Sequence, residues 1–121
     1  MHMNLNRGDL WYVDLGANKV GSEQGGIRPC VIIQNNVGNH HSPTTIVAVI
    51  TSARKNKMPT HFILGKREGL QKTSLCLCEQ ILVVDKTRLK NYIGRLNDSK
   101  IQELNQCLLV SLGFDERFNE L

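Results

Sequence analysis

A short polar stretch, residues 21–29 with the sequence GSEQGGIRP, holds the groups in this chain that are best suited to chemistry. Its nine positions include three glycines, a hydroxyl, a carboxylate, an amide and a guanidinium. Glycine allows the backbone to come close to a ligand, and the guanidinium of Arg28 can grip a phosphate through two parallel hydrogen bonds. These residue types favour a site for a phosphate-bearing ligand.

The loop must be held by the segment that follows it. Residues 30–33, CVII, form an apolar run that predicts a buried strand, so Arg28 lies where the polar loop meets that strand. Polar loops on rigid strands often carry binding and catalytic groups. A glycine-rich loop between two strands is also often a simple connection.

Other polar residues stand at similar strand positions. Thr51 ends a buried run, His61 lies just inside a short strand, and Glu79 and Gln80 interrupt a third apolar run. Each has a structural alternative: Thr51 can be satisfied by backbone, His61 can be a packing residue, and Glu79 can pair with a buried arginine. Together, beside the glycine loop, they strengthen the functional reading.

Strand patterns dominate the first three quarters of the chain. Apolar, aromatic and β-branched runs predict strands over residues 10–15, 30–34, 45–51, 60–64 and 74–84, and residues 90–96 fit a short strand or a turn of helix. Residues 35–43 predict a polar loop.

The last quarter changes to helical spacing. Ile101, Leu104 and Leu108 begin the apolar repeat, Asn97 or Asp98 can cap it, and a glycine at position 113 can end it. We expect a mostly β (α+β) fold: a small barrel or twisted antiparallel sheet closed by a C-terminal amphipathic helix. Such a fold does not name a function.

Composition sets broad limits. The 121 residues suit one domain, and 40% hydrophobic with 21% charged residues indicates a globular protein. No apolar run is long enough for a membrane span, and the polar N-terminus does not resemble a signal peptide. A net charge of +4 fits a polyanionic partner but is also common among soluble proteins.

The four cysteines lie in apolar segments and show no CxxC spacing. We interpret them as reduced, packed thiols of a cytoplasmic protein. A zinc site would need two further ligands beside Cys76 and Cys78.

Several segments match one known family. Most specific are the loop 21–29 and the following VIIQN of residues 31–35; weaker matches are RGDLWYVDL at 7–15, residues 42–51, 75–81 and DKTRL at 85–89. On these motifs the chain, from Met3 to about Gly113, resembles the MazF/PemK family, the toxins of type II toxin–antitoxin pairs. The Cys76 and Cys78 pair stands where plain aliphatic residues are expected.

The resemblance implies a sequence-specific endoribonuclease, an mRNA interferase, that cuts single-stranded RNA without a metal or other cofactor. It also implies an SH3-like barrel core, a homodimer, a cytoplasmic location and a MazE-like antitoxin whose C-terminal segment covers the RNA site. We expect a single toxin domain over residues 3–121, with residues 1–2 as a cloning remnant.

The resemblance also assigns roles to residues. Arg28 and Thr51 fall on the catalytic positions. The RNA-binding positions are Ser22, Glu23, Gln24 and Gln80.

The chemistry of RNA cleavage agrees with these residue types. The 2′-OH of RNA can attack the adjacent phosphorus, leaving a 2′,3′-cyclic phosphate and a 5′-OH, so no water has to be activated. Arg28 can stabilise the charge on the phosphate oxygens, and Thr51 can donate its hydroxyl to the same phosphate. Glu23 and His61 are candidate acid/base residues for the proton of the 2′-OH.

Substrate recognition has its own candidates. Amides such as those of Gln24 and Gln80 can read the edges of unstacked bases, and Lys55 and Lys57 can hold backbone phosphates. Two other functions stay open: a gyrase poison on the same fold, resembling CcdB, and an RNA-binding barrel without catalysis. The gyrase poison would need neither Arg28 nor Thr51 near a phosphate.

Overall fold

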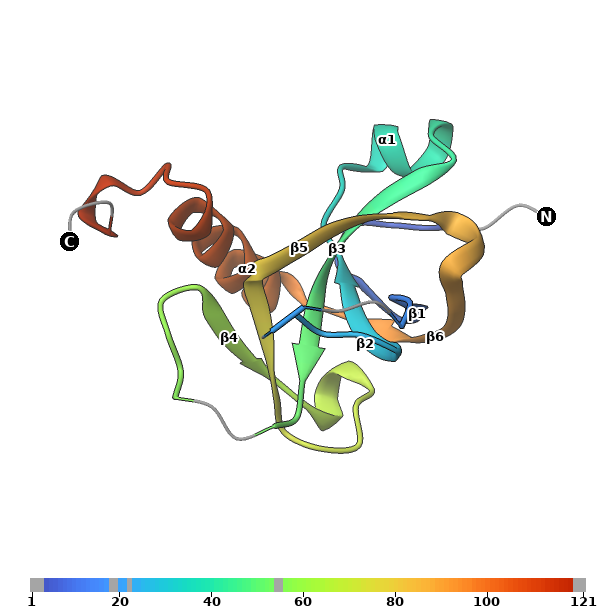
Figure 1. Ribbon diagram of the computed structural model, residues 1–121. Helices are drawn as coiled ribbons and strands as arrows, with labels where there is room; N and C mark the ends of the chain where they lie inside the picture. Colours follow the sequence, from blue (N-terminus) through green and yellow to red (C-terminus); the bar gives the residue numbers. More distant parts are fainter. Residues whose placement is uncertain (1–3, 18–19, 22, 54–55, 119–121) are drawn as a thin grey trace.

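The computed structural model describes residues 4–17, 20–21, 23–53 and 56–118 (Figure 1). In this part of the chain one antiparallel sheet has six strands in the order β4-β5-β3-β2-β1-β6. The strands are β1 (Asp9–Asp14), β2 (Ile27–Ile32), β3 (Thr44–Thr51), β4 (His61–Leu64), β5 (Ser74–Asp85) and β6 (Leu89–Arg95). The helices are α1 (Asn36–His41) and α2 (Asp98–Ser111), with 3-10 turns η1 (Lys66–Glu68), η2 (Lys86–Arg88) and η3 (Glu116–Phe118).

Strand β5 is the longest strand and bends sharply in its middle (Figure 1). Its register with β3 changes there, because Ala48 lies opposite Ile81 whereas the next residue, Val49, lies opposite Leu77. Residues 78–80 therefore form a bulge that has no counterpart in β3. A bulge of this kind bends a strand and redirects its side chains, and here it contains two of the polar residues picked out from the sequence, Glu79 and Gln80.

The two ends of the curled sheet meet through two glycines. A Cβ at Gly94 of β6 would lie 2.1 Å from the carbonyl oxygen of Glu68, and a Cβ at Gly69 would lie 2.5 Å from that of Ile93. Only glycine tolerates such a close backbone approach. The segment after β4 thus packs against β6, which confirms the predicted barrel-like, strongly twisted sheet.

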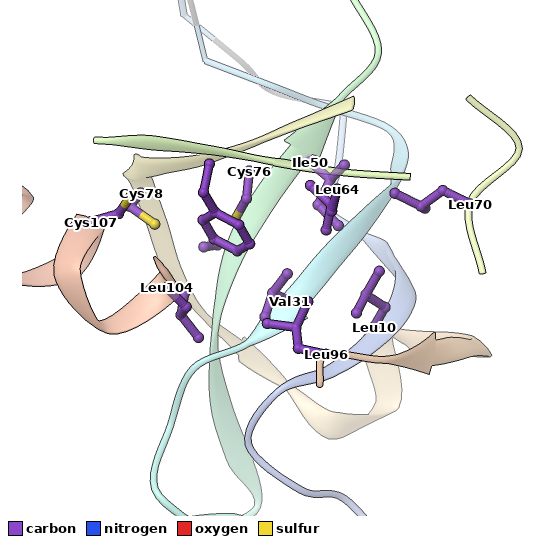
Figure 2. Packing of buried hydrophobic residues seen from close by; sticks show 12 residues of the cluster. Leu10, Val31, Ile50, Leu64, Leu70, Cys76, Cys78, Leu96, Leu104 and Cys107 are labelled. Carbon is purple, nitrogen blue, oxygen red and sulfur yellow. The ribbon is translucent and has the colours of Figure 1, made fainter. Parts of the chain in front are cut away.

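The sheet packs on both faces because its apolar residues alternate. On β2, Val31 belongs to one buried cluster, whereas its neighbours Cys30 and Ile32 belong to the other. The first cluster also receives Leu104 and Cys107 from α2 (Figure 2). The second cluster includes Leu5 near the N-terminus and Val84 and Leu89 from the bent end of the sheet.

The C-terminal helix begins and ends as the sequence predicts. The side chain of Asn97 accepts a hydrogen bond from the amide of Lys100, and Gly113 takes a φ of +81° just after the helix. Residues 89–95 form strand β6, which settles the choice between strand and helical turn. Among the described helices, none is long and apolar enough to cross a membrane.

One predicted loop is partly helical. Residues 35–43 contain α1, whose first turn is capped by the Asn35 side chain accepting from the Gly38 amide. Asn39 is the buried residue of this helix, and its side chain is hydrogen-bonded to Gln34 and Thr45. The prediction was wrong because a run of asparagine and histidine reads as a solvated loop, whereas local capping and a buried amide order it here.

Candidate functional site

Arg28 lies on β2 at the end of the glycine-rich loop, half-buried and opposite Val13 of β1. Its Nε donates to the carbonyl oxygen of Gly25 at 3.0 Å, which fixes the base of the guanidinium against the loop. Within the described part of the chain no second partner occupies the terminal nitrogens. Those nitrogens can therefore grip an anion as a fork.

Thr51 ends β3 beside the start of the same strand β2. The two strands pair with Cys30 opposite Val49, and the same register continued by two residues sets Arg28 opposite Thr51. Cys30 and Val49 belong to the same buried cluster, so Arg28 and Thr51 also belong to one face of the sheet. Residues directly opposite on one face have Cβ atoms about 5 Å apart, so a single phosphate can touch both side chains.

The hydroxyl of Thr51 already has one contact. Its Oγ1 accepts from the amide of Ala53 at 3.1 Å, which turns the chain as it leaves β3. Thr51 is buried, with 3% of its surface exposed. Because that contact uses the oxygen as acceptor, the hydroxyl hydrogen can still be donated to a ligand at the strand end.

A hydrogen bond joins the glycine-rich loop to the bulge of β5. The backbone amide of Gln24 donates to Oε1 of Gln80 at 3.1 Å, across 56 residues of sequence. The loop is further closed by Gly26, whose amide donates to the carbonyl oxygen of Gly16 at 2.7 Å. The structure thus brings Gln24, Gln80 and the loop that ends at Arg28 to one end of the sheet.

His61 and Glu79 form a pair beside that bulge. Nε2 of His61 lies 2.9 Å from Oε2 of Glu79, and Nδ1 of His61 accepts from the amide of Met58 at 3.2 Å. Thr60 donates its hydroxyl to the other carboxylate oxygen of Glu79 at 3.1 Å. His61 is buried, with 2% of its surface exposed, so neither of its ring nitrogens is open to solvent.

The charge state of Glu79 follows from these contacts. Burial raises the pKa of this carboxyl, but the hydrogen bond and charge of His61, its own backbone amide and the Thr60 hydroxyl outweigh that effect. The net result is a pKa below the ordinary value, so Glu79 is ionised at neutral pH. Its partner is a histidine, and not the buried arginine that the sequence suggested as one alternative.

The remaining predicted site residues lie on exposed loops. Glu23 is exposed, and its Oε1 accepts from the amide of Val20 at 2.7 Å. Lys57 is exposed in the segment between β3 and β4. Ser22 and Lys55 lie outside the described residues.

The cysteines lie in the core and not at this site. All four are free and buried, and burial raises the pKa of Cys30 to about 12. Cys78 and Cys107 lie next to each other between β5 and α2 (Figure 2). Within the described ranges, no group of three or more histidine, cysteine, aspartate or glutamate side chains could hold a metal ion.

Sequence reasoning singled out Glu79 but gave it no place in the site, and it missed Thr60. Two features of the sequence could have identified these residues. Thr60 directly precedes the short strand β4, which pairs with β5, and Glu79 and Gln80 interrupt the apolar pattern of β5 just beyond that pairing. The structure shows that this interruption is a bulge held from β4.

Comparison with known proteins shows the family of this chain. Residues 6–112 match the family model described as PemK-like, MazF-like toxin of type II toxin-antitoxin system. Endoribonuclease EndoA of Bacillus subtilis (strain 168) is 46% identical over 112 residues, which is 91% of this chain and 96% of that protein.

Solved structures share the fold. An endoribonuclease in complex with its cognate antitoxin, from a mycobacterial species, matches with a TM-score of 0.77 and 26% identity over 90% of this chain and 95% of the other. MazF of Deinococcus radiodurans matches with a TM-score of 0.75 and 21% identity over 90% and 96% of the two chains, a likeness of fold. The chain belongs to the PemK-like, MazF-like family of type II toxin–antitoxin toxins.

Proposed function

We propose that this chain is an endoribonuclease toxin that cuts single-stranded RNA through the attack of the RNA's own 2′-OH. Its family and the 46% identical endoribonuclease support the class of activity. The observation that supports the chemistry is the register of β2 and β3: continued two residues beyond the Cys30–Val49 pair, it would set Arg28 opposite Thr51 on one face of the sheet.

In this mechanism the protein aligns the phosphate with the attacking 2′-OH and stabilises the negative charge on the phosphate oxygens. The guanidinium of Arg28, fixed through Nε to Gly25, presents its terminal nitrogens to two non-bridging phosphate oxygens. Thr51 donates its hydroxyl to the same phosphate. The attack yields a 2′,3′-cyclic phosphate and a 5′-OH, and because the nucleophile belongs to the substrate, no metal-activated water is needed.

Of the two candidate bases, Glu23 is favoured over His61. Glu23 is exposed on the glycine-rich loop, and among the described residues its carboxylate uses only one oxygen, which accepts from the amide of Val20. His61 is buried and already uses both ring nitrogens. Accepting the proton of the 2′-OH would require His61 to break one of these contacts, whereas Glu23 has an unused oxygen.

Recognition and control follow from the same surface. Gln24 and Gln80, joined by a hydrogen bond, would read unstacked bases together with the hydroxyl of Ser22, and Lys55 and Lys57 would hold backbone phosphates. A MazE-like antitoxin would cover this surface. We also propose that the toxin is a homodimer and acts on mRNA in the cytoplasm.

The test is incubation of the purified protein with a long single-stranded RNA in the presence of EDTA, with both ends of every fragment identified. The expected result is discrete fragments with 5′-OH and 2′,3′-cyclic phosphate ends, and protection by the antitoxin. Intact RNA over several unrelated templates, or 5′-phosphate ends, would contradict the proposal. Intact RNA together with inhibited gyrase would favour the CcdB-like alternative.

A further inference from the structure

The bulge of β5 holds a third polar side chain, Glu79, which directly precedes Gln80. We propose that Glu79 is a specificity-determining residue, which accepts a hydrogen bond from the exocyclic amino group of one RNA base, and that His61 is the positioning residue that holds it. This inference rests on the proposed RNA-cleaving function.

Glu79 lies in the bulge of β5, one residue before Gln80. The change of register between Ala48 and Val49 leaves residues 78–80 outside the ladder with β3. Gln80, the next residue, is tied to the glycine-rich loop through the Gln24 amide. Glu79 keeps 40% of its side chain exposed, so it remains open to a ligand one residue away from Gln80.

The carboxylate of Glu79 is held by hydrogen bonds at both of its oxygens. Oε2 of Glu79 lies 2.9 Å from Nε2 of His61, and Oε1 accepts from the Thr60 hydroxyl at 3.1 Å. Both donors come from one neighbour, the start of β4, whose backbone is itself joined to the bulge by the Cys78 amide donating to the Thr60 carbonyl at 3.0 Å. Each carboxylate oxygen has a second lone pair for a ligand.

The ring of His61 is fixed in orientation by contacts at both nitrogens. Its Nδ1 accepts from the Met58 amide at 3.2 Å, so in the neutral ring the proton is on Nε2, which faces Glu79. The His61 amide also donates to the Met58 carbonyl at 2.9 Å. A buried ring fixed at both nitrogens is unsuited to moving a proton, but it is well suited to fixing the carboxylate that it contacts.

The ligand of Glu79 must provide a hydrogen-bond donor. Glu79 is an acceptor without a proton to donate, because its contacts lower the pKa of the carboxyl. A fixed negative charge repels phosphate, so the backbone of RNA is not its partner. The base donors of single-stranded RNA are the amino groups of adenine, cytosine and guanine and the imino N–H of guanine and uracil. A carboxylate commonly accepts from an amino group, as it does from that of cytosine, so we assign an amino group as the partner of Glu79. Uracil carries no amino group.

The test is the cut-site profile of a random-sequence RNA pool for wild type, Glu79→Gln and Glu103→Gln. Glu103 is a matched control, because it is also an ion-paired glutamate of similar exposure, 44%, but lies on α2 with Lys100 as its partner. We expect wild type to require an amino-bearing base at one position. Glu79→Gln should lower the preference at that position alone by about ten-fold, and Glu103→Gln should leave the profile unchanged.

The role of His61 needs its own pair of variants. His61→Phe keeps a ring but removes the donor to Glu79, and should relax the same position as Glu79→Gln. His61→Gln keeps an amide donor near the site of Nε2, and should restore most of the preference. A stability measurement accompanies both variants, and the profile is read per folded molecule, since loss of folding alone would lower the rate without changing which sequences are cut.

The outcomes separate the two proposals. If wild type does not cut RNA, the proposed function fails. If wild type cuts RNA but Glu79→Gln has an unchanged profile, or if uracil is selected at the position that Glu79→Gln alters, the assignment of Glu79 is overturned while the proposed function stands. If His61→Phe keeps the wild-type profile, the positioning role of His61 is overturned.

Discussion

Two polar regions of this molecule look alike in sequence and differ in structure. In α1, the Asn39 side chain is completely buried; its Nδ2 donates to the Gln34 carbonyl at 2.9 Å, and its Oδ1 accepts from Thr45 at 2.7 Å. The Lys86 ammonium group also donates to the Asn39 carbonyl. In the second region, hydrogen bonds fix Nε of Arg28 and the carboxylate of Glu79, and both side chains keep further donors or acceptors for a ligand.

This difference distinguishes polar groups that stabilise the fold from polar groups that can bind a ligand. Around Asn39 the hydrogen bonds satisfy a buried amide, so the cluster stabilises the fold and has no lone pair to offer a ligand at the surface. Around Arg28 and Glu79 the hydrogen bonds fix direction but leave donors or acceptors for a ligand. The largest effects on the two regions should therefore appear in different measurements.

Arg28→Ala should give the largest effect, on activity alone. Removing the phosphate-binding guanidinium should lower the single-turnover cleavage rate by about a thousand-fold, while urea unfolding changes little because Arg28 is only half-buried. Arg67→Ala is the control, since it removes an exposed arginine from η1. Equal cleavage by wild type and Arg28→Ala would remove Arg28 from the site.

Asn39→Ala should give the reverse pattern. Loss of its hydrogen bonds leaves Thr45 and Gln34 without a buried partner, so the free energy of unfolding should fall by about 3 kcal/mol. Cleavage per folded molecule should stay at the wild-type rate. Asn105→Ala, on the exposed side of α2, should change stability by less than about 0.5 kcal/mol. A stable Asn39→Ala variant with impaired cleavage would erase the distinction between the regions.

Thr51→Ala should lie between these two. Loss of the hydroxyl should lower the cleavage rate by about a hundred-fold and the stability by about 1 kcal/mol, since the Ala53 amide loses its acceptor. Thr51→Ser retains the hydroxyl and should recover most of the rate. If the serine variant is as slow as the alanine variant, the hydroxyl is not the group that acts.

The smallest effect is a dependence of stability on pH through Glu79. Its pKa is lower in the folded chain than the ordinary value of 4.5, so its contribution to stability is complete above about 4.5 and is lost as pH falls through the folded value. The contribution should stay below about 1 kcal/mol, because the carboxylate is 40% exposed. The difference in urea unfolding between wild type and Glu79→Gln should be constant above about pH 4.5 and become smaller as the pH falls below it; a difference that does not change with pH would contradict this linkage.

The regular elements could be predicted from the sequence because local patterns determine them. The apolar runs mark all of the major strands, and the Leu104 repeat with its Asn97 cap marks α2. The helix α1 was not predicted, because asparagine is as typical of loops as of helix caps, and the pattern does not show that the Asn39 side chain turns inward. It does so here to meet Gln34 and Thr45, which are near in sequence, and its carbonyl accepts from the distant Lys86.

The site shows the same division. Arg28 and Thr51 are predicted from their strand-end positions and from the family resemblance, and the register of β2 and β3, continued by two residues, assigns them to a common face. The hydrogen bonds of Glu79 could be anticipated only in part, because the apolar pattern predicts that β4 pairs with β5 but not that residues 78–80 bulge out of the pairing with β3 beside Thr60. A broken pattern shows that a strand is irregular, but not what its side chains contact.

The most direct test of the central claim is a single change in the substrate. A short RNA that contains the cut sequence is compared with the same RNA carrying 2′-deoxyribose only at the nucleotide before the scissile phosphate. If the 2′-OH at the site of Arg28 and Thr51 is the nucleophile, the substituted RNA should bind with similar affinity and remain uncut. Cleavage of the substituted RNA at the same bond would contradict the account.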